Sequence, residues 1–254
     1  MKEESIFITG AGSGMGQMAA QLFATQGYPV AALDVNEKGL LETAENHQNI
    51  RTFNTDVTNY DAVAAVVDET EAKLGPIKRV YNAAAIMPLG KVVDQDIEIF
   101  HRVMDINYNG VVNVSKAVMP RLLERNEGAL VNFASLAGWV PILYMAAYNA
   151  SKFAVVAFTE VLAHEHKDSN VKVLCVCPPP VKTPLLDQAR DTVWPKVFDQ
   201  GETIEPQDVL AAIDKAVAQD ELFVFPGKQT RMGQRMRRWF PNLIWKNVHQ
   251  TEGF

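Results

Sequence analysis

The sequence is poor in the residues that build metal sites and disulfide frameworks, with two cysteines and five histidines among its 254 residues. Cys175 and Cys177 alternate with valines, so both would face one side of a strand. Small core residues are a simpler interpretation of this pair than a redox site. His164 and His166 are two residues apart, which splays them on a helix, and no cysteine cluster supports them. We therefore expect no bound metal.

Long hydrophobic runs and an excess of positive charge are also missing. No apolar run reaches the roughly 20 residues of a membrane span without a charge or a proline. The N-terminal sequence MKEESIFITG lacks the basic start and the longer apolar core of a signal peptide. The formal net charge of −6 disfavours a general role in nucleic-acid binding. These absences predict a cytoplasmic protein without a nucleic-acid partner.

The composition is that of a folded protein with a sizeable core, because 48% of the residues are hydrophobic and 21% are charged. A chain of 254 residues suits one large domain or two small ones. It contains no internal repeat, low-complexity segment or interdomain linker. We therefore expect one domain over residues 1–227, followed by a tail over residues 228–254 that belongs to the same domain or forms an interface.

Short segments rich in Val, Ile and Ala alternate regularly with longer helical patterns. The expected strands are 5–9, 29–33, 51–54, 78–81, 129–133, 171–177 and 222–225, and the main expected helices are 18–26, 37–47, 60–74, 97–125, 144–162 and 206–218. Continuous apolar strands separated by helices are typical of a parallel sheet covered on both faces. The sequence thus predicts a single-domain α/β fold with a doubly wound parallel sheet of about seven strands.

A glycine-rich segment, GAGSGMG at residues 10–16, lies between the first strand and the first helix. Glycines allow a tight turn and a close approach to a pyrophosphate, and the following helix N-terminus offers free N–H groups to an anion. An ordinary strand-to-helix turn would not need four alternate glycines. Neither the generic G-x-G-x-x-G spacing nor the P-loop pattern fits this segment. We nevertheless predict that it binds phosphate.

Asp34 ends the second strand, about 20 residues beyond the glycine-rich segment. Its carboxylate could accept both hydroxyls of an adenosine ribose and would repel a 2′-phosphate. The residues that follow, Val35 and Asn36, include no arginine, so the sequence favours NAD over NADP. Asp34 could also cap the next helix, and the two roles are compatible.

Tyr148 and Lys152 lie four residues apart in the apolar stretch 144–162, so both side chains share one face of the expected helix. An ammonium beside a phenol favours the phenolate and would lower the pKa of Tyr148 from about 10. Such a tyrosine could donate and accept a proton for an alcohol and its ketone. The spacing alone is a weak indicator, because many helices carry a Tyr and a Lys four residues apart without a catalytic role.

With these residues in view, nearly the whole chain resembles the classical short-chain dehydrogenases/reductases. The matching motifs are the cofactor loop Thr9-Gly10-x-x-x-Gly14-x-Gly16, the NAD-selecting Asp34, the adenine-contacting pair Asp56-Val57, the catalytic tetrad Asn107, Ser135, Tyr148 and Lys152, and Val181 and Thr183 beside the nicotinamide carboxamide. Each match alone is weak, but all occur in the family's order. The resemblance implies a Rossmann-like catalytic domain, NAD as cofactor and assembly into a homodimer or homotetramer.

Two segments depart from the family's pattern. Where the family has the motif Asn-Asn-Ala-Gly, this chain has Tyr-Asn-Ala-Ala at residues 81–84. Where the family has Pro-Gly after the sixth strand, this chain has Pro178-Pro179. Ala84 adds one methyl group, whereas Pro179 and Pro180 remove two N–H donors and stiffen the wall beside the nicotinamide. We expect these changes to affect the substrate's position rather than the reaction. The expected cofactor-binding residues are Gly10, Ser13, Gly14, Met15, Gly16, Asp34, Asp56, Val57, Asn82, Ala83, Ala84, Tyr148, Lys152, Pro178, Val181 and Thr183.

The resemblance also implies a mechanism. In the oxidation direction, Tyr148 as phenolate takes the alcohol proton while the carbinol carbon gives a hydride to nicotinamide C4. Ser135 bonds the substrate oxygen. Lys152 lowers the pKa of Tyr148 and holds the nicotinamide ribose, and Asn107 fixes a water that relays protons from Lys152. Without the other matches, Ser135 would be a strand-end cap and Asn107 an amide inside a helix.

The expected substrate pocket is apolar. Its expected residues are Ser135, Leu136, Trp139, Met145, Tyr148, Pro179, Leu185, Leu186 and Trp194. No cluster of arginine or lysine stands beside Ser135 to receive a carboxylate or phosphate, so we expect a small hydrophobic secondary alcohol or ketone as the substrate. Many of these side chains could instead belong to the core or to a subunit interface.

Two other functions are compatible with the sequence. One is the reduction of 3-oxoacyl thioesters of a carrier protein or coenzyme A, although such enzymes usually prefer NADP and Asp34 argues against that cofactor. The other is a dinucleotide-binding sensor without turnover, against which the intact tetrad argues.

The tail over residues 228–254 is basic and amphipathic, with six Lys and Arg residues against one acid, Glu252. Pro241 breaks the first expected helix of the tail. Its apolar residues at helical spacing are Met232, Met236, Trp239 and Phe240, with Arg231, Arg235 and Arg238 on a neighbouring face. Such a helix can make peripheral contact with an anionic membrane. The alternative is that it packs on the body of the protein or on a partner subunit.

Overall fold

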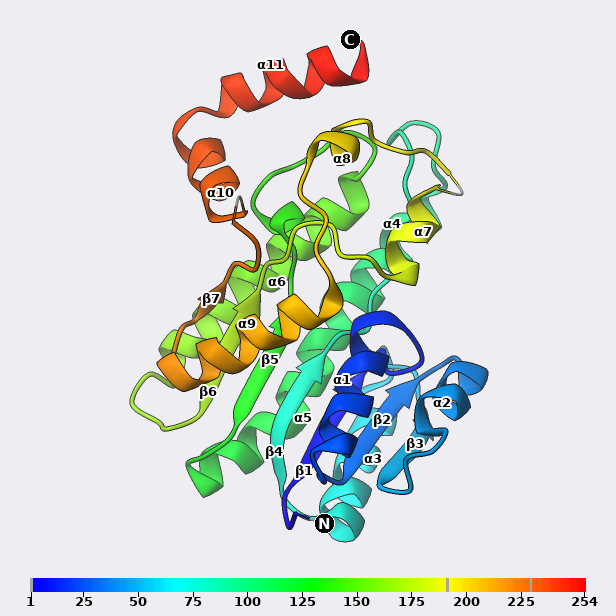
Figure 1. Ribbon diagram of the computed structural model, residues 1–254, viewed down its shortest axis with the longest axis vertical. Helices are drawn as coiled ribbons and strands as arrows, with labels where there is room; N and C mark the ends of the chain where they lie inside the picture. Colours follow the sequence, from blue (N-terminus) through cyan, green and yellow to red (C-terminus); the bar gives the residue numbers. More distant parts are fainter. Residues whose placement is uncertain (1, 191, 229) are drawn as a thin grey trace.

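A computed structural model describes residues 2–190, 192–228 and 230–254. Its centre is a parallel sheet of seven strands in the order β3-β2-β1-β4-β5-β6-β7 (Figure 1). The strands are β1 (Ser5–Thr9), β2 (Val30–Asp34), β3 (Ile50–Asn54), β4 (Ile77–Asn82), β5 (Ala129–Phe133), β6 (Lys172–Val176) and β7 (Phe223–Val224). The order reverses between β1 and β4, which opens a crevice at the carboxyl ends of these strands. The predicted doubly wound α/β fold is confirmed.

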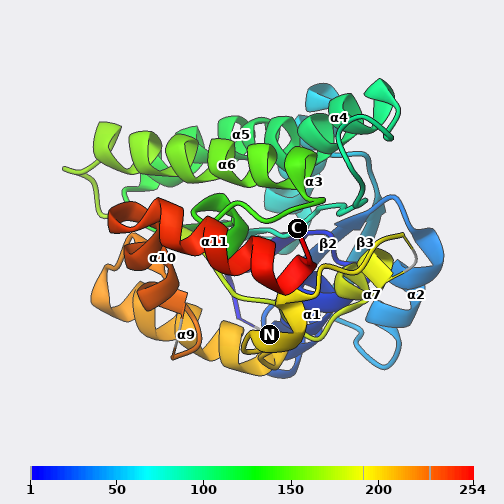
Figure 2. The same ribbon diagram turned by 90° about the horizontal axis from the view of Figure 1, so that it is seen from above.

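Helices cover both faces of this sheet (Figure 2). One face is covered by α1 (Gly14–Thr25), α2 (Glu37–Ala44) and α9 (Pro206–Gln219), and the other by α3 (Tyr60–Leu74), α5 (Gly110–Arg125) and α6 (Ala146–Glu165). The remaining helices are α4 (Ile97–Met104), the short turn η2 (Leu136–Gly138), α7 (Pro184–Arg190), α8 (Val197–Gln200), α10 (Thr230–Trp239) and α11 (Pro241–Glu252). None of the described helices is long and apolar enough to cross a lipid bilayer.

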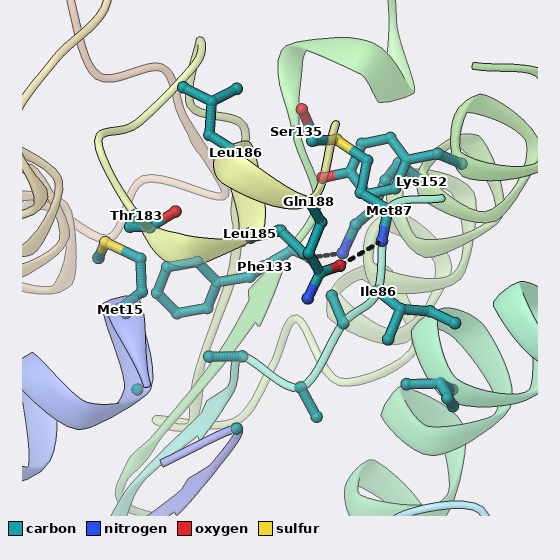
Figure 3. A pocket seen from close by; sticks show the side chains of 18 of the residues that line it. Met15, Ile86, Met87, Phe133, Ser135, Lys152, Thr183, Leu185, Leu186 and Gln188 are labelled. Carbon is teal, nitrogen blue, oxygen red and sulfur yellow. Dashed lines mark hydrogen bonds between the residues drawn. The ribbon is translucent and has the colours of Figure 1, made fainter. Parts of the chain in front are cut away.

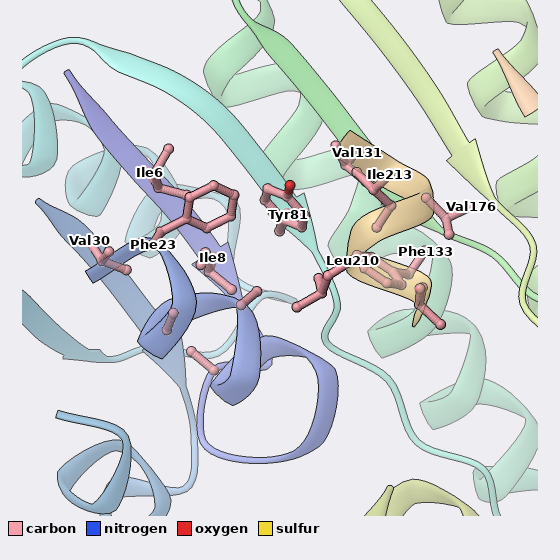
Figure 4. Packing of buried hydrophobic residues seen from close by; sticks show 14 of the residues in the cluster. Ile6, Ile8, Phe23, Val30, Tyr81, Val131, Phe133, Val176, Leu210 and Ile213 are labelled. Atoms are coloured by element: carbon pink, nitrogen blue, oxygen red, sulfur yellow. The ribbon is translucent and has the colours of Figure 1, made fainter. Parts of the chain in front are cut away.

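The core explains why the strands are apolar without alternation. In β1, Ile6 and Ile8 pack against α1 and α9, whereas Phe7 between them packs against α3 and α5. All three are fully buried because successive strand residues point to opposite faces and both faces are covered. Figure 4 shows the first of these layers, in which Phe23 and Ile213 lie on the sheet. The sheet is therefore a rigid support for the loops at its carboxyl edge.

One expected helix is interrupted. The stretch 97–125 forms α4, then the π-helical segment η1 (Asp105–Asn109), and then α5. Segments of this kind are rare and frequently occur at functional sites. Five π-helical residues change the spacing of apolar residues too little to be seen in a stretch of this length. The sequence therefore could not reveal the π-helical segment.

Candidate active site

A cavity of about 720 Å³ lies at the carboxyl edge of the sheet, where the loops after β1 to β6 meet. It brings together residues that are up to 188 positions apart, from Gly10 to Phe198. The expected cofactor-binding residues that line it are Gly10, Ser13, Gly14, Met15, Gly16, Asp34, Asp56, Val57, Ala83, Ala84, Tyr148, Lys152, Pro178, Val181 and Thr183. The sequence-based prediction thus converges on one site.

The glycine-rich loop has a shape that needs glycine. Gly10 and Gly14 have positive φ angles of 67° and 53°, which disfavour other residues. A Cβ on Gly16 would lie 2.2 Å from the carbonyl oxygen of Gly10, so α1 can begin this close to β1 only without a side chain there. Ser13, the N-cap of α1, makes no side-chain bond to the first turn. The N-terminus of α1 therefore remains open to an anion such as a pyrophosphate.

The Asp34 carboxylate is held in a fixed orientation at the end of β2. Its Oδ2 accepts a hydrogen bond from the N–H of Gly12 and its Oδ1 accepts one from the N–H of Asn36, each at 2.9 Å. Each oxygen keeps further acceptor capacity, which suits the hydroxyls of a ribose. The alternative role as the cap of α2 is wrong, since Asn36 accepts the hydrogen bond from the N–H of Gly39 instead.

Tyr148 and Ser135 form the polar centre of the cavity. Ser135 follows β5, and Tyr148 lies in the first turn of α6, where its side chain is buried and hydrogen-bonded to Ser135. Burial raises the pKa of Tyr148 to about 12, and the hydrogen bond from Ser135 opposes that rise. In the absence of a cofactor, Tyr148 is therefore a protonated phenol at neutral pH.

The expected lowering of the Tyr148 pKa by Lys152 is wrong for this state of the protein. The Lys152 ammonium donates a hydrogen bond to the carbonyl oxygen of Phe133 at 2.8 Å (Figure 3) and lies 5.6 Å from the centroid of the Tyr148 ring. Lys152 is only 2% exposed, and burial lowers its own pKa to about 8. Burial is thus the largest cause of both pKa shifts.

Asn107 lies outside the cavity lining and is held in place by hydrogen bonds. It is fully buried in η1, where its Oδ1 accepts from the N–H of Ile86 at 2.9 Å and its Nδ2 donates to the carbonyl oxygen of Ile86 at 3.0 Å. The same amide nitrogen donates to Ser151 Oγ on α6. Asn107 lies outside the cavity lining but fixes Ile86, which is part of it. Its role in a water relay stays a prediction.

Three other expected residues also have side chains outside the cavity lining. Asn82 donates a hydrogen bond to Asn132 Oδ1 on the neighbouring strand at 2.8 Å. Trp139 turns towards the sheet edge, where it contacts Phe223, and its indole donates to Cys177 Sγ. These partners are distant in sequence, so no local pattern could have placed the two side chains.

Trp194 is the third of these residues. Its ring packs on Phe198 with centroids 5.2 Å apart, and its indole donates to Asp199 Oδ1 at 2.8 Å. Phe198 lines the cavity in its place. The apolar segment after Thr183 was thus recognised, and it contributes Phe198 rather than Trp194 to the cavity lining.

The end of the cavity near Ser135 is mostly apolar, as expected. The predicted substrate-binding residues in its lining are Ser135, Leu136, Met145, Tyr148, Pro179, Leu185 and Leu186. Met87 and Gln188 also line it, and the Gln188 amide oxygen accepts a hydrogen bond from the N–H of Met87 at 3.5 Å (Figure 3). Gln188 stands three residues after Leu185, so helical spacing from Leu185 could have revealed it.

Comparisons with known proteins agree with this fold. The model of the family described as short chain dehydrogenase matches residues 4–194, and the chain therefore belongs to that family. The 2-(S)-hydroxypropyl-CoM dehydrogenase 3 of Xanthobacter autotrophicus is 36% identical over 183 residues, which are 70% of this chain and 71% of the relative. The meso-2,3-butanediol dehydrogenase of Serratia marcescens is 31% identical over 224 residues, which are 86% of this chain and 89% of the relative.

A solved structure gives the same result. A short-chain dehydrogenase/reductase from Burkholderia phymatum, determined in complex with NAD, superposes with a TM-score of 0.85 and 26% sequence identity, and the match covers 96% of each chain. Within this family, the present chain is an oxidoreductase.

Proposed function

We propose that this protein is an NAD-dependent oxidoreductase that interconverts a hydrophobic secondary alcohol and its ketone, with Tyr148 as the acid/base group. The observation that carries the proposal is the composition of one cavity. One end of the cavity has the open N-terminus of α1 and the oriented carboxylate of Asp34. The other end has the hydroxyls of Tyr148 and Ser135, which are hydrogen-bonded to each other, next to apolar side chains.

The residues present fit a dinucleotide. The glycine-rich loop would hold the pyrophosphate and Asp34 the adenosine ribose, and no arginine follows Asp34 to pair with a 2′-phosphate. When bound, NAD supplies a nicotinamide that accepts or returns a hydride. The NAD in the related Burkholderia phymatum structure supports this choice of cofactor.

The protein's own groups handle the proton. In the reduction direction, Tyr148 donates its proton to the ketone oxygen, and the hydroxyl of Ser135 bonds the same oxygen. In the cofactor-free protein, a pKa of about 12 means that Tyr148 carries the proton to be donated at neutral pH. The Lys152 ammonium, near the same ring, stabilises the phenolate that remains.

The substrate class follows from the apolar wall formed by Leu136, Met145, Leu185 and Leu186. The names of two relatives, a hydroxypropyl-CoM and a butanediol dehydrogenase, indicate that they act on secondary alcohols. We also propose that the protein works in the cytoplasm as a homodimer or homotetramer. Its two free cysteines, Cys175 and Cys177, suit that compartment.

The test measures the nicotinamide absorbance change with a panel of hydrophobic secondary alcohols and ketones, with NAD and with NADP. Tyr148→Phe should lower kcat about 10²–10⁴-fold with unchanged NAD affinity, because it removes only the transferred proton. Tyr108→Phe is the matched control, since Tyr108 packs on Phe158 outside the cavity lining. A Tyr148→Phe enzyme with normal turnover would refute the acid/base role. A strong preference for NADP would refute the role of Asp34.

A further inference from the structure

The last two helices of the chain, α10 and α11, lie at one end of the molecule, with α11 beyond α8 (Figure 1), and α10 contacts η2. They are attached to the body at defined points. Val248 is buried, Glu252 Oε1 accepts a hydrogen bond from the N–H of Val197 at 3.1 Å, and Thr230 Oγ1 donates to the carbonyl oxygen of Pro226. The tail is therefore an ordered part of the fold, and one of its faces packs on the body of the protein.

The same tail exposes large apolar side chains, each with more than half of its surface open to solvent. They are Met232 at 60%, Trp239 at 72%, Phe240 at 56% and Leu243 at 54%. Trp239, Phe240 and Leu243 are grouped where α10 meets α11, because Pro241 starts the second helix there. Solvent-exposed aromatic side chains grouped in this way commonly mark a contact surface.

Basic residues lie on the same two helices, and of these Arg231 pairs with Glu221 of the body at 3.8 Å. Arg231, Arg235, Arg238 and Lys246 are exposed on the same two helices. The one acid between residues 228 and 254 is Glu252, whose carboxylate accepts a hydrogen bond from the N–H of Val197 at the start of α8. The rest of the chain is acidic, since the whole chain still has a net charge of −6. The tail is thus a positive surface on a negative protein, and its field attracts anions.

We propose that α10 and α11 form a docking surface for an anionic lipid bilayer. Trp239, Phe240 and Leu243 would enter the headgroup region, while Arg235 and Arg238 pair with lipid phosphates. Aromatic and aliphatic side chains beside arginines are the pattern of helices that lie in a membrane interface. A second copy of this chain fits less well, because a two-fold interface would bring two positive surfaces together.

The position of the tail connects this surface to the cavity. Helix α10 contacts η2, where a Cβ added to Gly233 would lie 3.9 Å from Leu136 Cδ2, and α11 contacts α8, which carries Phe198. Leu136 and Phe198 both line the apolar end of the cavity. A docked bilayer would therefore lie beside that end and could supply a lipid-derived alcohol, a consequence that rests on the proposed function.

The experiment is co-sedimentation of the full-length protein with phosphatidylcholine vesicles, with and without phosphatidylglycerol, at low and high salt. We expect binding to the anionic vesicles at low salt, and at least tenfold weaker binding for Trp239→Ser/Phe240→Ser and for Arg235→Glu/Arg238→Glu. The matched controls are Val93→Ser, which changes an apolar residue that is 87% exposed elsewhere, and the charge reversal Lys38→Glu/Lys215→Glu. Both controls should bind as the wild type does.

Three results would overturn the proposal. One is the absence of binding to anionic vesicles at low salt, and another is an equal loss of binding in the controls. The third is a tail variant that dissociates from a larger assembly in sedimentation velocity without lipid, since the surface would then belong to a second copy. Circular dichroism and turnover of a short water-soluble alcohol show whether each variant is folded. A wild type that binds vesicles but never turns over would refute the proposed function alone.

Discussion

Replacing Lys152 with methionine should stabilise the protein in the absence of NAD and also abolish turnover. The ammonium of Lys152 is almost completely buried, and burial lowers its pKa from the usual 10.5 to about 8. In the unfolded chain the amine keeps its proton up to about pH 10.5. The folded protein therefore bears the cost of a buried charge at neutral pH, a cost that methionine of similar length does not have.

The expected gain follows from these two pKa values. A fall from 10.5 to about 8 corresponds to about 3 kcal/mol of destabilisation below pH 8. Methionine leaves the carbonyl of Phe133 without the hydrogen bond from Lys152, which costs about 1 kcal/mol. The net gain at pH 7 is thus about 2 kcal/mol. Between pH 8 and 10.5 the folded amine is neutral while the unfolded amine still binds a proton, so the wild type regains about 1.4 kcal/mol per pH unit.

Denaturant unfolding of the two proteins at pH 7, 8, 9 and 10 measures this difference. The titration of Tyr148 is common to both proteins, so it largely cancels when they are compared. Lys116→Met, at an exposed position of α5, is the control and should show no gain that depends on pH. The reasoning fails if Lys152→Met is less stable than the wild type at pH 7, or if its gain is the same at pH 7 and pH 10.

Two further predictions concern the cofactor end. Asp34→Ser should weaken NAD binding about 100-fold, because two hydrogen bonds from the ribose to the carboxylate, of about 1.5 kcal/mol each, are lost. An unchanged dissociation constant for NAD, measured by nicotinamide fluorescence, would contradict the role of Asp34 in binding the ribose. Gly16→Ala should abolish NAD binding and lower the melting temperature, because its Cβ would lie 2.2 Å from the oxygen of Gly10. Gly201→Ala, where the nearest atom is 3.7 Å away, is the control, and equal behaviour of the two variants would contradict the argument.

The site could be predicted in part because several of its features are local. Asp34 stands at the end of a strand and the glycines stand between a strand and a helix, and parallel strands bring such ends together at one edge. The order of the motifs then identified the family. The lengths and types of the elements followed from apolar patterning, except at η1, where a few π-helical residues interrupt α4 and α5 without a sequence signal.

Sequence by itself determined the fold class, the cofactor loop, the acid at the end of β2 and the identities of Tyr148, Ser135 and Lys152. Only the tertiary structure decided that the pKa of Tyr148 is raised, that Lys152 bonds the carbonyl of Phe133, and that Trp139 turns away from the cavity. The physical reason is that burial and hydrogen-bond partners are set by residues far apart in the chain. Spacing shows which side chains share a face, but desolvation and contact depend on what covers that face.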